Sequence, residues 1–206
     1  MISQLHYISQ YPHLENIQAA CDAGCNWIQL RVKDQPVAEI QELATTVKQL
    51  CDRYQATLII NDHPAIAVQV MAAGVHVGQE DMNAAAARLV VGDNKIVGGT
   101  ANTFEQIAQH IQNNASYVGV GPFRFTTTKQ KLSPILGLEG YRQILTTLKQ
   151  NELNIPLIAI GGIKLEDIPA LIEAGVHGIA VSGLISNSNN KALIVKEIYN
   201  LLKGNN

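Results

Sequence analysis

Cationic and amide side chains recur at alternate positions in one short segment of this 206-residue chain. Gln29, Arg31 and Lys33 stand two residues apart, and successive residues of a β-strand point to opposite sides, so the three project to one side. Arginine binds a phosphate through two parallel hydrogen bonds, and lysine binds it as a point charge. The segment therefore predicts a phosphate or diphosphate site. The alternative is internal ion pairing with carboxylates of the chain itself, namely Asp62, Glu80 and Asp81.

Two aspartates follow neighbouring β-rich runs and could share a cation. Asp62 comes directly after Asn61, and Asp81 follows the next run. Two carboxylates that face each other are unfavourable without a cation between them, and oxygen-only ligands favour Mg²⁺, which proteins hold with one or two carboxylates and substrate phosphates. We therefore expect Asp62 and Asp81 to bind Mg²⁺. Asp62 taken alone could instead cap a helix that begins at Pro64.

Hydroxyl groups and a lysine mark a long segment without periodic pattern, residues 121–131. Thr126 and Thr128 stand just before Lys129 in it. Long loops in compact barrels are usually binding loops or lids, so we expect this one to clamp an anion. Thr100 follows the fifth β-rich run, and we expect it to carry a free hydroxyl at the same end of the strands as this loop.

Small residues near the end of the chain predict a second anion pocket. Gly161 and Gly162 follow the seventh run, and Ser182 follows the eighth. In α/β barrels the backbone N–H groups at these places form a common phosphate site. Glycine as plain turn material is the alternative. Two pockets would accommodate two phosphorylated substrates, or one substrate phosphorylated at both ends.

Short β-rich runs alternate with amphipathic stretches along the whole chain. In Val37–Tyr54, for example, apolar residues recur at steps of three and four, the helical period. The β-rich runs are Leu5–Ile8, Trp27–Arg31, Thr57–Asn61, Gly74–Val77, Lys95–Val97, Tyr117–Gly119, Leu157–Ile160 and Gly178–Val181. Strict alternation indicates parallel βαβ units, and this many units in a chain of this length favour a closed barrel. We predict an α/β fold, a single (β/α)8 TIM barrel over residues 1–206, with a frayed tail at about 203–206. An open, doubly wound sheet is the alternative.

Local signals mark the ends of several helices. Ala23-Gly24-Cys25, Ala73-Gly74-Val75 and Ala174-Gly175-Val176 each precede a strand, where glycine would give the left-handed cap that ends a helix. Thr103 with Gln106 predicts a capping box at the start of another helix.

The composition excludes several classes of protein. Hydrophobic residues make up 47% and charged residues only 16%, against about 25% charged residues in typical domains, as expected for a fold with two buried layers. The net charge of −2 gives no reason to expect nucleic acid or an anionic membrane as partner. We see neither a signal peptide nor a membrane span, so a soluble cytoplasmic protein is expected. The three cysteines, Cys21, Cys25 and Cys51, are expected to be buried thiols.

The motifs together resemble the thiamine-phosphate synthase family. The matching segments cover nearly the whole chain: Gln29–Asp34, Ile60–Asp62, Gly74–Asp81, Tyr117–Pro122, Thr126–Lys129, Leu136–Gly140 and Ala159–Ile163. Gly78–Asp81 and Thr126–Lys129 are the more specific. The resemblance implies a transferase that joins a hydroxymethylpyrimidine diphosphate to the nitrogen of a thiazole phosphate. The products would be thiamine phosphate and pyrophosphate, formed by a dissociative substitution that Mg²⁺ assists.

The same resemblance implies a role for each matching residue. Asp62 and Asp81 would hold Mg²⁺. The pyrimidine diphosphate would contact Gln29, Arg31, Lys33, Asn61 and Lys129, with Gln29 near the pyrimidine. The thiazole phosphate would contact Thr126, Thr128, Gly162, Val181 and Ser182. Arg31, Thr100 and Lys129 would act catalytically, with Thr100 also touching substrate.

Four positions depart from the family pattern. Val32, Thr100, Asn102 and Phe125 stand where the family usually has glutamate, serine, histidine and proline. One alternative is a thiazole tautomerase, but those relatives characteristically have a histidine where this chain has Pro122 and lack the magnesium aspartates. Another is a non-catalytic barrel that binds thiamine precursors and regulates. An unrelated phosphate-sugar isomerase would need a carboxylate or cysteine pair for proton transfer. The sequence leaves open whether the chain forms a homodimer and whether the thiazole is carboxylated.

Overall fold

Strands and helices alternate along the chain in the computed structural model, which describes residues 1–79, 82–125 and 134–204. The strands in these ranges are β1 (Leu5–Ile8), β2 (Trp27–Leu30), β3 (Thr57–Asn61), β4 (Gly74–Val77), β5 (Ile96–Ala101), β6 (Tyr117–Val120), β7 (Leu157–Ile160) and β8 (Gly178–Val181). The helices are α1 (His13–Asp22), α2 (Val37–Arg53), α3 (Pro64–Gln69), α4 (Ala84–Val91), α5 (Phe104–Gln112), α6 (Gly137–Gln150), η1 (Leu165–Asp167), α7 (Ile168–Glu173), α8 (Gly183–Ser186) and α9 (Lys191–Leu202).

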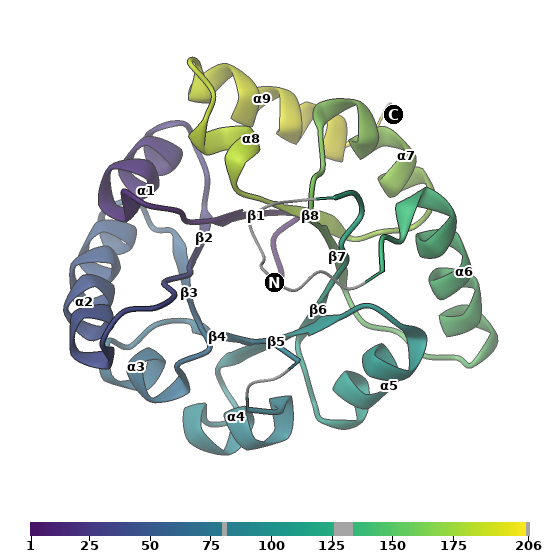
Figure 1. The fold of residues 1–206 in the computed structure, drawn as a ribbon, viewed down its shortest axis with the longest axis horizontal. Helices are drawn as coiled ribbons and strands as arrows, with labels where there is room; N and C mark the ends of the chain where they lie inside the picture. The colour runs from purple at the N-terminus through teal and green to yellow at the C-terminus, as the bar shows by residue number, and fades with distance from the viewer. Residues whose placement is uncertain (80–81, 126–133, 205–206) are drawn as a thin grey trace.

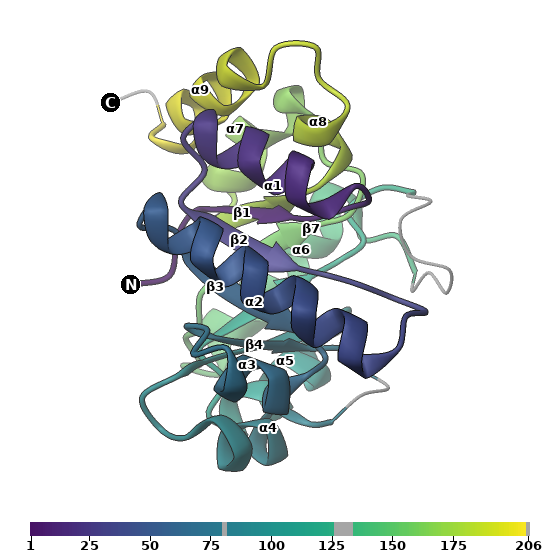
Figure 2. The ribbon, with the colours of Figure 1, turned by 90° about the vertical axis from the view of Figure 1, so that its left-hand side faces the viewer.

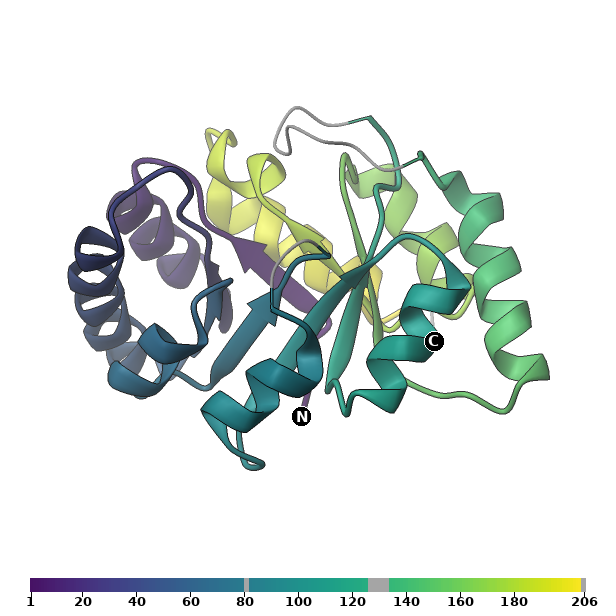
Figure 3. The same cartoon turned by 60° about the horizontal axis from the view of Figure 1, so that its bottom comes forward.

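The strands close into a barrel in the order β1 to β8. All neighbouring pairs are parallel, and β8 pairs with β1 through Leu5 and Ile179. Figure 1 looks into this ring, and Figure 3 shows the helices outside it. Figure 2 shows the N-terminus on the side from which the strands start. The predicted (β/α)8 barrel is therefore confirmed, and the open sheet is excluded.

Strand β5 is longer than predicted, because it continues through two glycines to Ala101. A Cβ atom on Gly98 would lie 2.2 Å from Cζ of Tyr117, and one on Gly99 would lie 2.2 Å from Cε1 of His110. The glycines make room for these two rings and do not end the strand. The expectation that β5 stops at Val97 was wrong for this reason.

The glycines before strands do not all act as helix caps. Gly24 and Gly175 have φ of +99° and +104°, which confirms the left-handed cap at both. Gly74 is instead the first residue of β4, and the left-handed position after α3 belongs to Met71, with φ of 55°. A Cβ on Gly74 would lie 2.0 Å from the carbonyl oxygen of Ile96, so close strand packing requires this glycine.

Strand residues alternate between two buried layers. Outward-facing residues such as Leu30, Val75 and Val118 pack with helix residues such as Ile17 and Val47 in one large cluster. Inward-facing residues form a second, smaller cluster inside the barrel: Ile8, Trp27, Ile59, Tyr117, Ile158 and Ala180. The barrel is thus filled with side chains and positions its functional groups at the strand ends.

Aromatic rings fill much of the interior. His6 stacks on Trp27 with ring centroids 4.3 Å apart, and Tyr117 meets His6 edge-on at 5.0 Å and Trp27 at 5.9 Å. Burial lowers the pKa of His6 to about 3, with the nearby His76 adding to the effect. His6 is therefore a neutral core residue, held by a hydrogen bond from Nε2 to the Ser3 carbonyl at 3.0 Å.

Two local predictions agree with the structure. Thr103 and Gln106 form the expected capping box at the start of α5. All three cysteines are buried free thiols, and burial raises the pKa of Cys21 to about 11 and that of Cys25 and Cys51 to about 12.

Candidate active site

A chain of hydrogen bonds joins the carboxyl ends of β2 and β3. Gln29 Nε2 donates to Asn61 Oδ1 at 2.7 Å, and Asn61 Nδ2 donates to Asp62 Oδ2. Lys33 Nζ binds the same carboxylate oxygen, while Asp62 Oδ1 accepts a hydrogen bond from the Gly78 N–H at 3.2 Å. The structure thus brings together four of the five predicted site residues that these strand ends contribute, all except Arg31.

The backbone at Asp62 directs its carboxylate toward this cluster. Asp62 has φ of 63°, a left-handed conformation that is uncommon for residues other than glycine. Its N–H donates to the His76 carbonyl at 2.8 Å. His63, not Asp62, occupies the N-cap position of α3, which begins at Pro64. The alternative that Asp62 caps this helix was therefore wrong.

Arg31 differs from Lys33 in how its charge is met. The Lys33 ammonium pairs with Asp62, so internal pairing holds for that residue. The backbone N–H of Arg31 donates to Ser9 Oγ at 3.2 Å, but its guanidinium has no ion pair with any residue in 1–79, 82–125 or 134–204. Arg31 is half-buried, and a guanidinium without an ion pair among the described residues is suited to an anionic ligand.

Thr100 lies within β5 and not in a loop after it. The prediction that its hydroxyl is free was wrong. His76 Nε2 is 3.0 Å from Thr100 Oγ1, and His76 Nδ1 is 3.0 Å from the Tyr117 hydroxyl. The Thr100 carbonyl accepts hydrogen bonds from His110 Nε2, at 2.9 Å, and from Gln79 Nε2. The extension of β5 explains the difference, because it turns the Thr100 side chain inward beside His76.

The loops after β6 and β7 are tied together by an arginine that the sequence motifs did not single out. Arg124 Nη1 and Nη2 donate to Asp167 at 2.7 and 2.9 Å, and Nη1 also donates to the Gly162 carbonyl at 2.9 Å. Burial raises the pKa of Asp167, but the hydrogen bonds from Arg124 and Lys164 outweigh it, so the pKa is lowered. A Cβ on Gly162 would lie 2.8 Å from the Phe125 carbonyl, so close packing by itself requires glycine here.

Of the two predicted site residues at the end of β8, Ser182 offers its side chain and Val181 only its main chain. Ser182 Oγ donates to Gln10 Oε1 at 3.3 Å, and Gln10 Nε2 donates to Asn187 Oδ1 at 3.1 Å. The Val181 side chain belongs to the outer, helix-facing cluster. Any ligand contact of Val181 at the barrel mouth must therefore use its main chain.

Four predicted site residues lie outside the described ranges. They are Asp81, Thr126, Thr128 and Lys129.

Comparison with known proteins identifies the family of this chain. A family model described as thiamine monophosphate synthase matches residues 2–185. The chain is 49% identical to thiamine-phosphate synthase of Flavobacterium johnsoniae, covering 100% of this chain and 99% of that protein. It is 48% identical to thiamine-phosphate synthase of Flavobacterium psychrophilum, over 96% and 98% of the two chains. The chain belongs to the thiamine-phosphate synthase family.

A solved structure supports the same assignment. Thiamine phosphate pyrophosphorylase from Pyrococcus furiosus matches with a TM-score of 0.84 and 28% identity, over 97% of this chain and 95% of that one. Membership of the thiamine-phosphate synthase family makes the chain a transferase of thiamine biosynthesis.

The positions that depart from the family pattern have different environments. Val32 is buried in the outer cluster, and Phe125 is 63% exposed. Asn102 is buried, and its Nδ2 donates to the Gly121 carbonyl at 3.0 Å and the Pro134 carbonyl at 2.9 Å. Asn102 thus joins backbone on either side of the segment that contains Thr126–Lys129.

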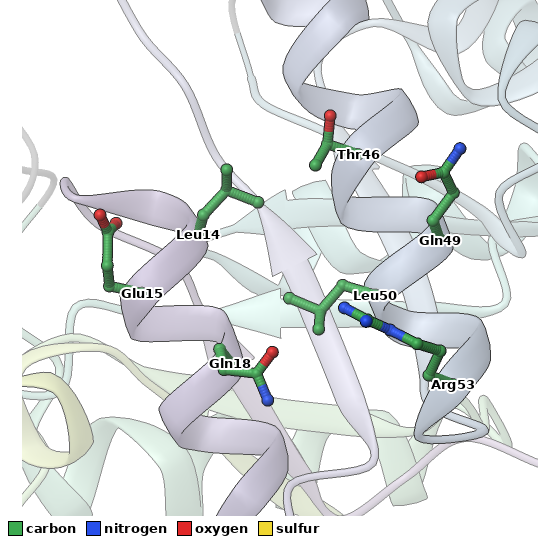
Figure 4. Close-up of a pocket in the computed structure, with 7 residues that line it drawn as sticks. All are labelled: Leu14, Glu15, Gln18, Thr46, Gln49, Leu50 and Arg53. Carbon is green, nitrogen blue, oxygen red and sulfur yellow. The ribbon is translucent and has the colours of Figure 1, made fainter.

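A groove on the outer surface is separate from these strand ends. It lies between α1 and α2, as Figure 4 shows, and is lined by Leu14, Glu15, Gln18, Thr46, Gln49, Leu50 and Arg53. Within the described ranges, no helix is long and apolar enough to cross a membrane, and no group of three or more His, Cys, Asp or Glu side chains is placed to hold a metal.

Sequence reasoning missed His76, Tyr117, Arg124 and Gln10 as residues that hold site groups in place. For the first two a signal existed, because alternation along β4 and β6 places both in the barrel interior. Arg124 and Gln10 lie in loops, where no periodic pattern indicates direction.

Proposed function

We propose that the chain joins a hydroxymethylpyrimidine diphosphate to the nitrogen of a thiazole phosphate, giving thiamine phosphate and pyrophosphate. Family membership supports the reaction. The observation that carries it is the Arg31 guanidinium, which has no ion-pair partner in the described part of the chain and directly follows β2, the strand that contributes Gln29 to the Gln29–Asn61–Asp62–Lys33 cluster. A diphosphate supplies the negative charge that this cluster lacks.

Each substrate has its own part of the barrel mouth in this proposal. Arg31, Lys33 and Asn61 bind the diphosphate, and Gln29 lies near the pyrimidine, with Lys129 completing the diphosphate site. The second pocket holds the thiazole phosphate through Thr126, Thr128, Gly162, the Val181 main chain and Ser182. The Lys33 side chain is 45% exposed, whereas that of Asp62 is 10% exposed. The Lys33 ammonium is therefore the member of this pair that a phosphate arriving from solvent can reach.

The described residues fit a magnesium ion as cofactor. Asp62 supplies carboxylate oxygens, the hard ligands that Mg²⁺ prefers. Asp62 and Asp81 would hold the ion, which when bound neutralises diphosphate charge. The Asp62 carboxylate is already oriented for this by Asn61 and the Gly78 N–H.

The reaction requires no general base. The bond between the pyrimidine methylene carbon and the diphosphate oxygen breaks, and its electron pair leaves with pyrophosphate. The lone pair of the thiazole nitrogen then forms the new bond to the same carbon, and the ring becomes a thiazolium. Arg31, Lys33 and Lys129 stabilise the negative charge that builds on the leaving group.

Incubation with both substrates and Mg²⁺ tests the proposal, with thiamine phosphate and pyrophosphate as readouts. We expect Arg31→Ala to lower kcat/KM by about 100-fold or more, and Asp81→Ala or Lys129→Ala to abolish turnover without unfolding. Arg53→Ala is the matched control, because Arg53 lines the outer groove on α2 (Figure 4). Precursor binding without any product would instead favour a regulatory protein, and isomerisation of the thiazole alone would favour a tautomerase.

A further inference from the structure

Three side chains from neighbouring strands form a buried relay inside the barrel. The Tyr117 hydroxyl on β6 contacts His76 Nδ1 on β4, and His76 Nε2 contacts Thr100 Oγ1 on β5, both at 3.0 Å. Tyr117 is 1% exposed and His76 is 6% exposed. The relay therefore leads from the closed interior to the hydroxyl that lies nearest the mouth.

The direction of the hydrogen bonds follows from Tyr117. Burial raises the pKa of its phenol far above the ordinary value, so the hydroxyl keeps its proton. His76 Nδ1 is the hydrogen-bond partner of this hydroxyl among the described residues. A buried O–H without an acceptor costs about 1–3 kcal/mol, whereas an unused lone pair on the same oxygen costs less. Tyr117 therefore donates to Nδ1.

We propose that Tyr117 is a positioning residue that fixes His76 in the Nε2–H tautomer and thereby presents the Thr100 hydroxyl to the substrate as a hydrogen-bond donor. Because Nδ1 accepts from Tyr117, a neutral His76 carries its proton on Nε2 and donates it to Thr100 Oγ1. That bond occupies a lone pair of the Thr100 oxygen and leaves its proton for another acceptor. The proposal rests on the proposed function for the identity of that acceptor.

The surrounding structure holds Thr100 in place from the backbone side as well. The Thr100 carbonyl accepts from His110 Nε2 and from Gln79 Nε2. A carbonyl can only accept, so His110 also carries its proton on Nε2. Gly98 leaves space for the Tyr117 ring, and Gly119 lies against His76, where a Cβ would be 3.3 Å from Cε1. The strands are thus shaped around the relay.

The pyrimidine diphosphate offers two kinds of acceptor to a donor at this position, a ring nitrogen and a phosphate oxygen. Each can accept a hydrogen bond from the Thr100 hydroxyl, and the phosphate oxygen gains negative charge as the diphosphate leaves. If the Thr100 hydroxyl instead directed its proton at His76, it could donate to neither of these acceptors. The tautomer of His76 therefore decides whether Thr100 assists the reaction.

NMR of the full chain with 15N-labelled histidine tests the tautomer without substrate. We expect the His76 signals of an Nε2–H tautomer, and an Nδ1–H tautomer or an imidazolium would overturn the proposal. In Tyr117→Phe, which keeps the ring contacts with His6 and Trp27, we expect the tautomer preference to weaken. Because this readout needs no turnover, a wild-type chain that makes no thiamine phosphate would refute the proposed function and leave this result standing.

Kinetics test the link to Thr100. We expect Tyr117→Phe to lower kcat by about ten-fold, the effect of one lost hydrogen bond. Tyr141→Phe is the matched control, because its buried hydroxyl donates to the Val120 carbonyl outside the relay. In a Thr100→Val background, Tyr117→Phe should cause no further loss. Unchanged kcat in Tyr117→Phe, or full additivity in the double variant, would overturn the positioning role.

Inhibition identifies the acceptor. If Thr100 donates to a phosphate oxygen, Tyr117→Phe should weaken inhibition by pyrophosphate. If it donates to the ring, the variant should weaken inhibition by the unphosphorylated hydroxymethylpyrimidine. Unchanged inhibition by both would count against the donor role.

Discussion

Acidification should destabilise this barrel through one histidine in its interior. Burial holds the pKa of His6 at about 3, against an ordinary value of 6.5. The unfolded chain therefore binds a proton at this residue over the range in which the folded chain does not. The stability that His6 contributes is complete above pH 6.5 and is lost progressively as the pH falls toward 3.

The size of the effect follows from the two pKa values. Lowering the pH from about 7 to about 5 should remove about 2 kcal/mol of unfolding free energy through His6 alone. The loss is a large share of the stability of a typical domain, which is about 5–15 kcal/mol.

Urea unfolding of wild type and His6→Gln at both pH values measures this effect. The glutamine keeps an N–H donor for the Ser3 carbonyl, which accepts from His6 Nε2. It removes the titration and also the ring contacts with Trp27 and Tyr117, but the loss of those contacts is common to both pH values. The stability difference between wild type and variant should change by about 2 kcal/mol between the two pH values. Parallel pH profiles for the two chains would refute the reasoning, because the remaining titratable groups are common to both.

Further predictions concern packing and loop positioning. Arg88 donates to the carbonyls of Gly92, Lys95 and Asn114, so Arg88→Ala should lower the unfolding free energy by about 2 kcal/mol in urea, with thiamine phosphate formation retained. Gly98→Ala should cost about 1–3 kcal/mol or more in thermal unfolding, because its Cβ would overlap the Tyr117 ring. Asn102→Asp directs a carboxylate at two carbonyl oxygens, and we expect it to raise the KM for substrate by at least about ten-fold. An unchanged KM would show that these two bonds do not position the neighbouring segment.

The sequence was sufficient to predict the barrel because its evidence is periodic. Alternation along strands and helical spacing in stretches such as Val37–Tyr54 depend only on local geometry. The structure has β1, β3, β4, β7 and β8 at the predicted bounds. Strand order then follows from parallel βαβ connections. The same local reasoning placed Gln29 and Asn61 together at neighbouring strand ends.

Glycine was the residue type that local reasoning misread. Gly98 and Gly99 have the appearance of a turn after β5, yet they lie within the strand because rings from β6 and α5 occupy the space of their missing side chains. Gly74 is a glycine because the backbone of β5 approaches it. In each case the partner lies more than ten positions away in the sequence, so no local pattern could show it.

The same misreading hid the chemistry of Thr100. Once β5 is extended, Thr100 alternates inward with the interior positions, and its hydroxyl meets His76. A threonine in place of the serine usual in the family keeps that hydroxyl, while its additional methyl group restricts rotation about χ1. The fold then controls the direction in which the Thr100 hydroxyl proton points, and not only the presence of the hydroxyl. The buried Tyr117 on β6 supplies that control through His76 on β4. A residue remote from the barrel mouth can therefore govern the Thr100 hydroxyl at the mouth.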